Sequence, residues 1–115
     1  MDKHNRLQVF KRADVSGQVF IHNDDTLFQA SIVNLSAGGV FLNRLIEYDT
    51  DTPVRVVIKA RGLSTPIQAI GRVVRVEREK RQGIAVEFTS ISRQSREQIQ
   101  NCVLANRMKT ALKSV

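Results

Sequence analysis

The chain has 115 residues, which is enough for one hydrophobic core and too few for two. Apolar residues make up 42% of the sequence, which indicates a globular chain, and the absence of Trp indicates a core built mainly on Val, Ile and Leu. The formal net charge of +7 indicates a polyanionic partner, for which a nucleic acid, a membrane surface and a phosphorylated small molecule all qualify.

The composition also predicts the compartment. A single cysteine, Cys102, excludes an internal disulfide and is typical of a reducing environment. No apolar run approaches the roughly 18 residues of a membrane span, and the first residues lack the apolar region of a signal peptide. We therefore expect a soluble cytoplasmic protein that makes no membrane contact.

Residues 1–12 form a polar, basic arm without clear periodicity. We expect this arm to be flexible, packing lightly or becoming ordered when a partner binds. Its last cations, Lys11 and Arg12, stand immediately before the first predicted strand. An arginine at this place can offer a planar fork of donors to a phosphate or to a guanine edge, with its face free to stack.

The middle of the chain, residues 13–90, alternates short apolar runs with turn signals. Period-two patterns predict six strands, and Gly71 interrupts the fifth, where we expect a bulge or a close backbone approach. Turns rather than helices separate the strands, which favours an antiparallel barrel or sandwich. The predicted strands are residues 13–21, 27–33, 40–42, 54–59, 67–76 and 83–88.

Residues 91–115 change character and belong to the same domain as a C-terminal helix. Ser95 and Gln98 fit a capping box that opens a helix ending near Leu112. At about 100° per residue its apolar residues form two nearly opposite groups. One group can cap the barrel, and the other would face solvent, a protein partner or a second copy in a homodimer; alternatively, the helix kinks or frays after Asn106. The two groups are Ile99, Cys102 and Val103, and Leu104, Met108, Ala111 and Leu112.

The sequence carries no pattern of catalysis or metal binding. It has no P-loop and no Gly-x-Ser-x-Gly. His4 and His22 lack metal-ligand spacing with Cys102, which we interpret as a small buried apolar residue on the helix. We expect a protein that is not an enzyme and that needs no metal or cofactor.

One polar stretch lies between two apolar runs. Residues 34–39 read Asn-Leu-Ser-Ala-Gly-Gly. The Asn34 and Ser36 side chains can bond their own backbone and fix a turn, or they can present an amide and a hydroxyl to a ligand. Gly39 would let such a ligand approach the backbone closely. The residues alone leave both interpretations open.

The basic arm, this stretch and the order of the strands together resemble the PilZ domain, a bacterial family of cyclic di-GMP receptors. The family carries Arg-x-x-x-Arg on its arm and Asp/Asn-x-Ser-x-x-Gly on the following turn, and residues 34–39 match the second motif in full. Gly83 and Phe88 in the last predicted strand, followed by a helix, are also similar. The resemblance covers residues 6–104 and implies a mostly β fold, a six-stranded antiparallel β-barrel with a C-terminal helix.

The first family motif is incomplete in this chain. Arg12 matches its second arginine, but Gln8 stands where the first would be, and Arg6 lies two residues too early unless the arm slides. Gln8 cannot supply the missing charge. The loss of one charge-assisted contact costs about 1.5–3 kcal/mol, or roughly ten- to a hundredfold in affinity.

The resemblance implies roles for individual residues. Arg12 would bind phosphate and stack on a guanine, Asn34 and Ser36 would bond the other guanine edge or the ribose-phosphate, and Gly39 would keep the floor of the site clear. Lys11 would add charge nearby. The candidate ligand-binding residues are Arg12, Asn34, Ser36, Gly39, Lys11, Gln8, Arg6 and Arg72.

Three functions compete. The leading hypothesis is a non-catalytic cyclic di-GMP receptor whose arm becomes ordered over the barrel on binding and which then signals to a protein partner. The incomplete motif favours the alternative, a degenerate family member that no longer binds the nucleotide and acts as a protein-interaction module in motility or pilus control. Direct binding of nucleic acid is least favoured, because the chain has few aromatic residues for stacking and no recognition-helix motif.

Overall fold

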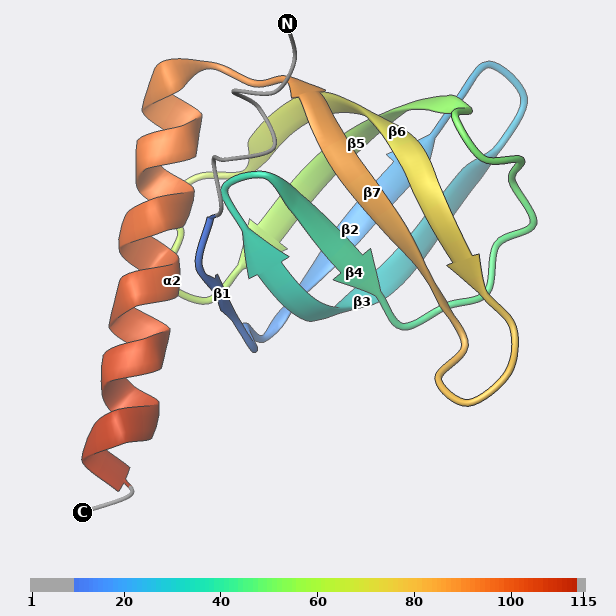
Figure 1. Ribbon diagram of the computed structural model, residues 1–115. Coiled ribbons are helices and arrows are strands. Elements are labelled where there is room, and N and C mark those ends of the chain that lie inside the picture. Colours follow the sequence, from blue (N-terminus) through green and yellow to red (C-terminus); the bar gives the residue numbers. More distant parts are fainter. Residues whose placement is uncertain (1–9, 114–115) are drawn as a thin grey trace, which may run out of the picture.

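The computed structural model describes residues 10–113, which form an antiparallel barrel with a long helix beside it (Figure 1). Strands β2 to β7 close the barrel in the order β2-β5-β6-β7-β4-β3, and β3 pairs with both β2 and β4. The predicted six-stranded barrel with a C-terminal helix is confirmed, and β1 is an additional short strand paired with β3. The elements are β1 (Arg12–Ala13), β2 (Gly17–His22), β3 (Leu27–Ser36), β4 (Gly39–Leu42), β5 (Pro53–Ala60), β6 (Ile67–Glu77), β7 (Gly83–Ser90) and α2 (Arg93–Lys113).

The predicted first strand, residues 13–21, is two strands in the structure. Arg12 pairs with Ser36 in β1, whereas β2 resumes on the same neighbour one residue out of register, with Gln18 opposite Ser31. The break buries Val15, which is 3% exposed, and it turns the Ser16 carbonyl to accept the Arg61 N–H at 2.9 Å. The chain therefore exchanges a few ladder hydrogen bonds for burial of an apolar side chain.

The polar stretch at residues 34–39 is mostly strand, and the prediction of a turn along its whole length was wrong. Asn34 and Ser36 are the last residues of β3, and only residues 37–38 form the turn into β4. Ser36 is 2% exposed, and its Oγ accepts the Gly38 N–H at 3.1 Å and donates to the Gly39 carbonyl at 3.4 Å. The Ser36 hydroxyl thus fixes a two-residue turn, which is the backbone-bonding role that serines adopt in turns.

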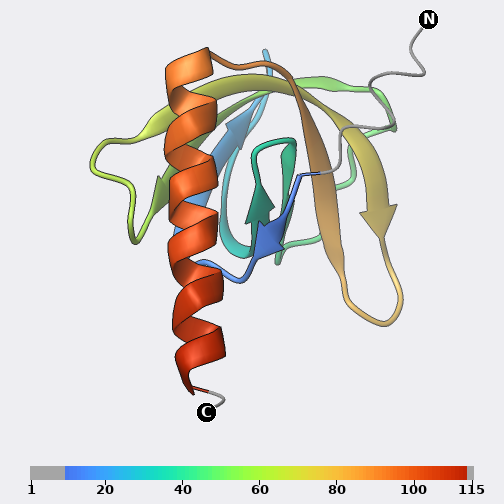
Figure 2. The same cartoon turned by 60° about the vertical axis from the view of Figure 1, so that its left-hand side comes forward.

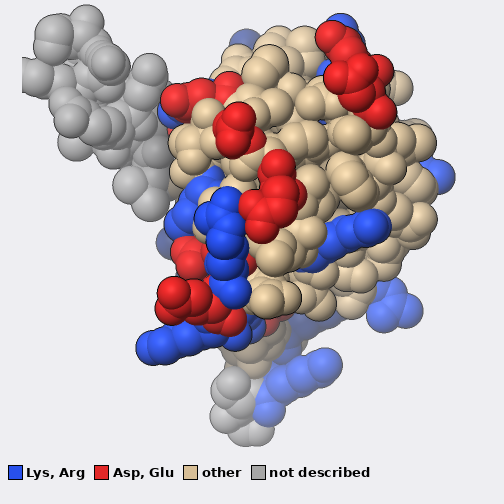
Figure 3. Space-filling model, turned by 90° about the vertical axis from the view of Figure 1, so that its right-hand side faces the viewer, with Lys and Arg blue, Asp and Glu red and all other residues tan. Residues whose placement is uncertain are grey.

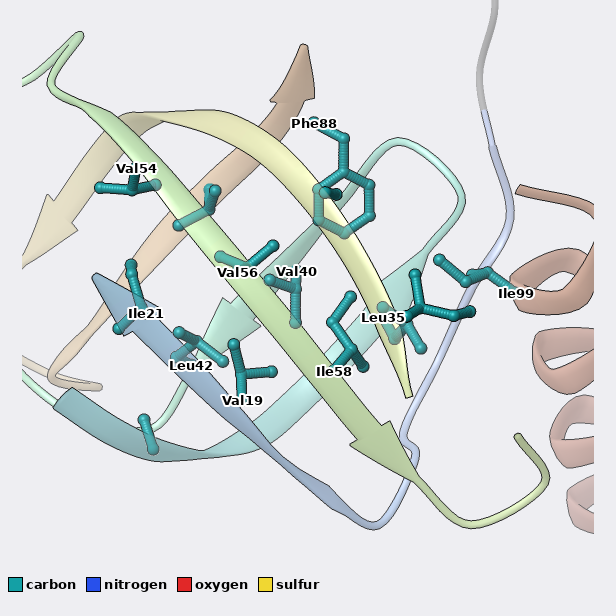
Figure 4. Close-up of a cluster of buried hydrophobic side chains, with 14 of the residues drawn as sticks. Val19, Ile21, Leu35, Val40, Leu42, Val54, Val56, Ile58, Phe88 and Ile99 are labelled. Atoms are coloured by element: carbon teal, nitrogen blue, oxygen red, sulfur yellow. The ribbon is translucent and has the colours of Figure 1, made fainter. Parts of the chain in front are cut away.

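Aliphatic side chains fill the barrel, as the composition predicts. Figure 4 shows side chains from β2, β3, β4 and β5 converging on its interior, and Ile99 extending from α2 toward Leu35 at one end. Ile99 and Leu35 are both fully buried. The helix therefore supplies the side chain that closes this end of the core.

The N-cap of helix α2 lies three residues earlier than the predicted capping box at Ser95 would place it. Ser92 is the N-cap, because its Oγ accepts the Ser95 N–H at 3.0 Å. The helix continues through Asn106 to Lys113, so the alternative in which it frays after Asn106 was wrong. It is the only helix within residues 10–113, and it is too polar to cross a membrane.

The two apolar groups on α2 lie in different surroundings, as predicted. Ile99, Cys102 and Val103 are buried against the barrel. Leu104, Met108 and Leu112 are 47%, 64% and 72% exposed. Residues 107–113 are exposed on all sides, and Figures 1 and 2 show this end of the helix running past the barrel.

Cys102 is the buried apolar residue that the sequence predicts. It is 3% exposed, and its thiol donates to the Arg61 carbonyl at 3.4 Å. Burial raises the pKa of the Cys102 thiol, which keeps it protonated and a weak nucleophile. The residue is therefore part of the contact between α2 and the turn that follows β5.

The bulge and the close backbone approach expected at Gly71 are both present. The β6–β7 register shifts between Ile70 and Gly71, and a Cβ on Gly71 would lie 2.5 Å from the Glu87 carbonyl oxygen. A second shift lies between Val73 and Arg75. These two bulges decide which β6 side chains face outward.

Candidate functional site

A hollow of about 1070 Å³ opens on the side of the barrel. Its walls are the β1 strand, the β3–β4 turn, the outer face of β7, the hairpin between β6 and β7, and the first turn of α2. This volume reaches the upper end of the range for small-molecule sites, about 300–1,000 Å³. The hollow is therefore large enough for a nucleotide-sized ligand.

The hollow carries an excess of positive charge. Five cationic side chains line it against two carboxylates, a formal excess of three positive charges. Both carboxylates already have partners: Glu77 pairs with Arg75 at 2.6 Å, and Glu87 pairs with Arg72 at 2.9 Å. The site therefore attracts an anion. The lining cations are Arg12, Arg75, Lys80, Arg81 and Arg96.

Arg12 and Asn34 meet at the edge of the hollow. The pairing of Arg12 with Ser36 in the β1–β3 ladder brings Asn34, two residues away on the same face, next to the arginine. The Arg12 Nη1 donates to Asn34 Oδ1 at 3.0 Å. Within residues 10–113 the Arg12 guanidinium has no carboxylate partner. Its remaining N–H groups are thus available to an anionic ligand.

The structure brings four of the eight predicted residues together. Arg12, Asn34, Ser36 and Gly39 all line the hollow. Lys11 is exposed beside Arg12 but is not part of the lining. The predictions for the remaining two arm residues, Arg6 and Gln8, lie outside the described residues.

Arg72 is not part of the hollow. Its guanidinium bonds Glu87 and Asp51, and the hydrogen bond to Glu87 is the main reason why the pKa of Arg72 is raised. Arg75 lines the hollow instead. Since the shift between Val73 and Arg75 leaves both Val74 and Arg75 exposed, this bulge is what presents Arg75 outward.

Gly39 also has a structural role in the pairing of β4 with β7. A Cβ on Gly39 would lie 2.4 Å from the Val86 carbonyl oxygen, so close pairing of β4 with β7 requires glycine. Its expected contribution to a clear floor stays a prediction.

We expect Gly39→Ala to lower the free energy of unfolding by about 1–3 kcal/mol, because the added methyl group must push β4 away from β7. Urea denaturation would measure the loss. Gly38→Ala is the matched control, since its methyl group would meet side chains, the Phe10 ring and the Ser36 Oγ, and no backbone carbonyl. Equal stability of Gly39→Ala and the unsubstituted protein would contradict the packing argument.

Several lining residues were not predicted as site residues. In the hairpin between β6 and β7, Lys80 and Arg81 line the hollow, while Arg78 pairs with Glu47 at 2.7 Å. Phe10 and Arg96 also line it, with the Arg96 Cζ 5.5 Å from the centroid of the Phe10 ring. No local sequence pattern identifies Arg96, because its position depends on where the end of β7 places the start of α2.

Acidic and basic side chains mix on a neighbouring face of the barrel. Figure 3 shows the side a quarter turn away from the view of Figure 1, on which acidic and basic side chains lie next to one another. The connection over residues 43–52 contributes two such contacts, Glu47 with Arg78 and Asp51 with Arg72. Exposed pairs of this kind contribute little to stability. They do pair two of the cations there, Arg72 and Arg78, with carboxylates.

The chain is similar to known proteins in sequence pattern and in fold. The family model of the PilZ domain matches residues 6–105. None of the curated proteins matches the sequence. The PilZ domain of YcgR from Escherichia coli, solved with c-di-GMP, has a TM-score of 0.70 at 11% identity, over 93% of this chain and 96% of that one.

Two further solved structures share the fold. The Bacillus subtilis inhibitor of motility, MotI/DgrA, has a TM-score of 0.76 at 15% identity, over 89% of this chain. This chain covers 51% of that protein, about half its length. The PilZ domain of CeSA, from a cellulose-synthesizing bacterium, has a TM-score of 0.58 at 18% identity, over 83% of this chain and 96% of that one.

Proposed function

The chain belongs to the PilZ domain family, and from this premise we propose that it is a non-catalytic receptor for cyclic di-GMP that passes the binding event to a protein partner. The observation that carries the proposal is the cationic hollow with Arg12 and Asn34 at its edge. The YcgR domain of the same fold was solved with this nucleotide, which supports the choice of ligand.

The chemistry of the hollow suits the ligand. Cyclic di-GMP presents two phosphodiesters and two guanines, so its binding needs cations, flat stacking surfaces and amide-type hydrogen bonds. Arg12 combines a donor fork for phosphate with a flat face for a base. Asn34 can turn its amide to a guanine edge. Arg75, Lys80 and Arg81 add the positive field that draws the dianion in.

The basic arm completes the site in this proposal. The arm, which the sequence predicts over residues 1–12, would lie over the hollow when the nucleotide binds, since Arg12 in β1 already lies at its edge. Arg6 or Lys11 would supply part of the charge that Gln8 does not. Ser36 contributes through the turn that it fixes, because its hydroxyl is already bonded to Gly38 and Gly39.

Helix α2 is the element that would report binding. The Arg107 Nη1 donates to the Arg12 carbonyl oxygen at 2.9 Å. Arg12 thus contacts α2 through its backbone while its side chain lies at the hollow, and Figure 2 shows β1 beside the helix. A shift of β1 on ligand binding would move α2 and its exposed Leu104, Met108 and Leu112. This face would engage a protein partner or, as the other possibility, a second copy of the chain.

The test is a calorimetric titration of the protein with cyclic di-GMP, with GTP as the control nucleotide, at near-physiological salt. We expect saturable binding at micromolar or tighter affinity for cyclic di-GMP and none for GTP. Gln8→Arg restores the first motif arginine and is expected to tighten binding about ten- to a hundredfold. Absence of binding in both proteins would reject the receptor function.

A second candidate is an interaction module that no longer binds the nucleotide and acts in motility or pilus control. The exposed apolar face of α2 favours it, because that face is available without any ligand. The same titration separates the two functions: binding by Gln8→Arg alone would mean that the natural chain has lost the ligand and retained the fold.

A further inference from the structure

Arg96 is a half-buried residue with an unmet hydrogen-bonding need at one atom of its guanidinium. It lies in the first turn of α2 and its side chain lines the hollow. Its Nε is buried and has no hydrogen-bond partner within residues 10–113. Arg93, one turn earlier on the same helix, is 93% exposed and pairs with Glu97 at 3.7 Å. The two arginines share a helix end but differ in their surroundings.

The neighbours of Arg96 do not supply an acceptor. The two carboxylates of the hollow, Glu77 and Glu87, pair with Arg75 and Arg72. The described neighbour of the Arg96 guanidinium is the Phe10 ring, whose centroid is 5.5 Å from Cζ. An aromatic face attracts a cation but accepts no strong hydrogen bond. The planar fork of a guanidinium fits phosphate, and a phosphate oxygen would satisfy it.

Phe10 lies between the turn and the helix. A Cβ on Gly38 would be 2.8 Å from the Phe10 Cδ2, so the ring rests directly on the turn that carries Ser36. The ring also packs against the edge of the hydrophobic core and lies beside the Arg96 guanidinium. The ring therefore lies over the arginine at the wall of the hollow. A ligand that enters must move the ring or share the guanidinium with it.

We propose that Arg96 is a phosphate-binding residue of this site and that Phe10 covers it until a phosphate-bearing ligand displaces the ring. The proposal rests on the proposed function in so far as the ligand is a nucleotide. Its consequence is a direct link from ligand phosphate to the first turn of α2. This link is separate from the bond of Arg107 to the Arg12 carbonyl farther along the helix.

The test compares four variants by calorimetric titration with cyclic di-GMP. We expect Arg96→Ala to weaken binding about ten- to a hundredfold and Arg96→Lys to recover part of the loss through its charge. Arg93→Ala removes the same charge one turn away and should bind like the unsubstituted protein. Phe10→Ala should bind about two- to fivefold more tightly, since the cation–π contact no longer competes.

Unchanged affinity of Arg96→Ala would overturn the phosphate-binding role. Unchanged or weaker affinity of Phe10→Ala would overturn the covering role. Thermal unfolding of the ligand-free proteins guards against a folding defect. Because the Arg96 Nε has no partner to lose, we expect Arg96→Ala to melt within a few degrees of the unsubstituted protein. Arg96→Gln keeps more of the side chain and replaces that variant if it does not fold.

A second readout follows Arg96 itself and uses inorganic pyrophosphate as the probe. The ¹⁵N–¹H signal of the Arg96 Nε, assigned by its loss in Arg96→Lys, should shift on titration, whereas the Arg93 signal should not. A shift with pyrophosphate and no binding of cyclic di-GMP would support Arg96 and reject the proposed ligand. If cyclic di-GMP binds, but Arg96→Ala has no effect and the Arg96 signal does not shift, the proposed ligand would be supported and the role of Arg96 rejected.

Discussion

Replacing Arg12 with alanine is expected to abolish measurable binding of cyclic di-GMP, with a loss of about a hundredfold or more in affinity. A charge-assisted hydrogen bond contributes about 1.5–3 kcal/mol, and stacking on a base contributes about 1–3 kcal/mol. Both contributions come from one side chain, so they do not simply add. A loss of about 1.4 kcal/mol already lowers the affinity tenfold. The substitution also removes the donor that orients Asn34 Oδ1 at 3.0 Å.

The fold should tolerate this change. The Arg12 side chain is exposed, and its backbone makes the contacts to Ser36 and Arg107, which alanine keeps. Exposed substitutions of this kind usually change the free energy of unfolding by less than about 0.5 kcal/mol. Calorimetric titration then measures a loss of affinity that does not come from unfolding.

Arg55→Ala is the matched control for Arg12→Ala. Arg55 is an exposed arginine on β5, opposite Ile70 in the ladder, and does not line the hollow. The Arg55→Ala substitution removes the same charge and should leave binding within about twofold, since Arg55 does not line the hollow and salt screens exposed charges over about 8 Å. Equal affinity of Arg12→Ala and Arg55→Ala would show that Arg12 is not a ligand residue.

The parts of the fold that were predictable from the sequence depend on short-range patterns. Period two predicts the strand at residues 27–33, and the structure shows this alternation in β3, where Ala30 is buried between the exposed Gln29 and Ser31. The helix group containing Ile99 was likewise separable from the group containing Leu104 by angle alone. Such patterns are local because the side-chain period of a strand or helix is fixed by backbone geometry.

The errors arose where distant contacts decide between local alternatives. Ser92 and Ser95 are both acceptable N-caps, and the structure uses Ser92 for the helix that follows β7. The strand at residues 13–21 alternates well, but the Arg61 N–H draws the Ser16 carbonyl out of the ladder. A contact between residues so far apart in the chain leaves no mark on the local pattern.

The candidate site shows the same division. The motif at residues 34–39 identified Asn34, Ser36 and Gly39, since their spacing is local. Arg75 was missed as a site residue because a strict alternation from Val73 turns it inward, and only the bulge in β6 presents it outward. Arg96 was missed because three elements, β1, the β3–β4 turn and α2, must meet before its surroundings exist. Sequence motifs therefore identified the residues at one edge of the hollow. The positions of Arg75 and Arg96 depend on long-range packing and were not predictable from the motifs.

Ile99→Ala is expected to lower the free energy of unfolding by about 2–5 kcal/mol, the range for truncating a buried aliphatic side chain. Ile99 is fully buried and closes the end of the barrel beside Leu35 (Figure 4). The loss is large against the roughly 5–15 kcal/mol that stabilises a domain. Urea denaturation followed by circular dichroism would measure it.

Leu104→Ala is the matched control on the same helix, because Leu104 is 47% exposed on the opposite side from Ile99. We expect its free energy of unfolding to stay within about 0.5 kcal/mol of the unsubstituted protein. Equal losses in the two variants would mean that α2 does not dock through Ile99. The two variants also distinguish the docking of α2 on the barrel from the binding of a partner. Leu104→Ala should bind the nucleotide with unchanged affinity. A loss of partner binding in that variant would therefore identify the exposed face of α2 as the surface that the partner contacts.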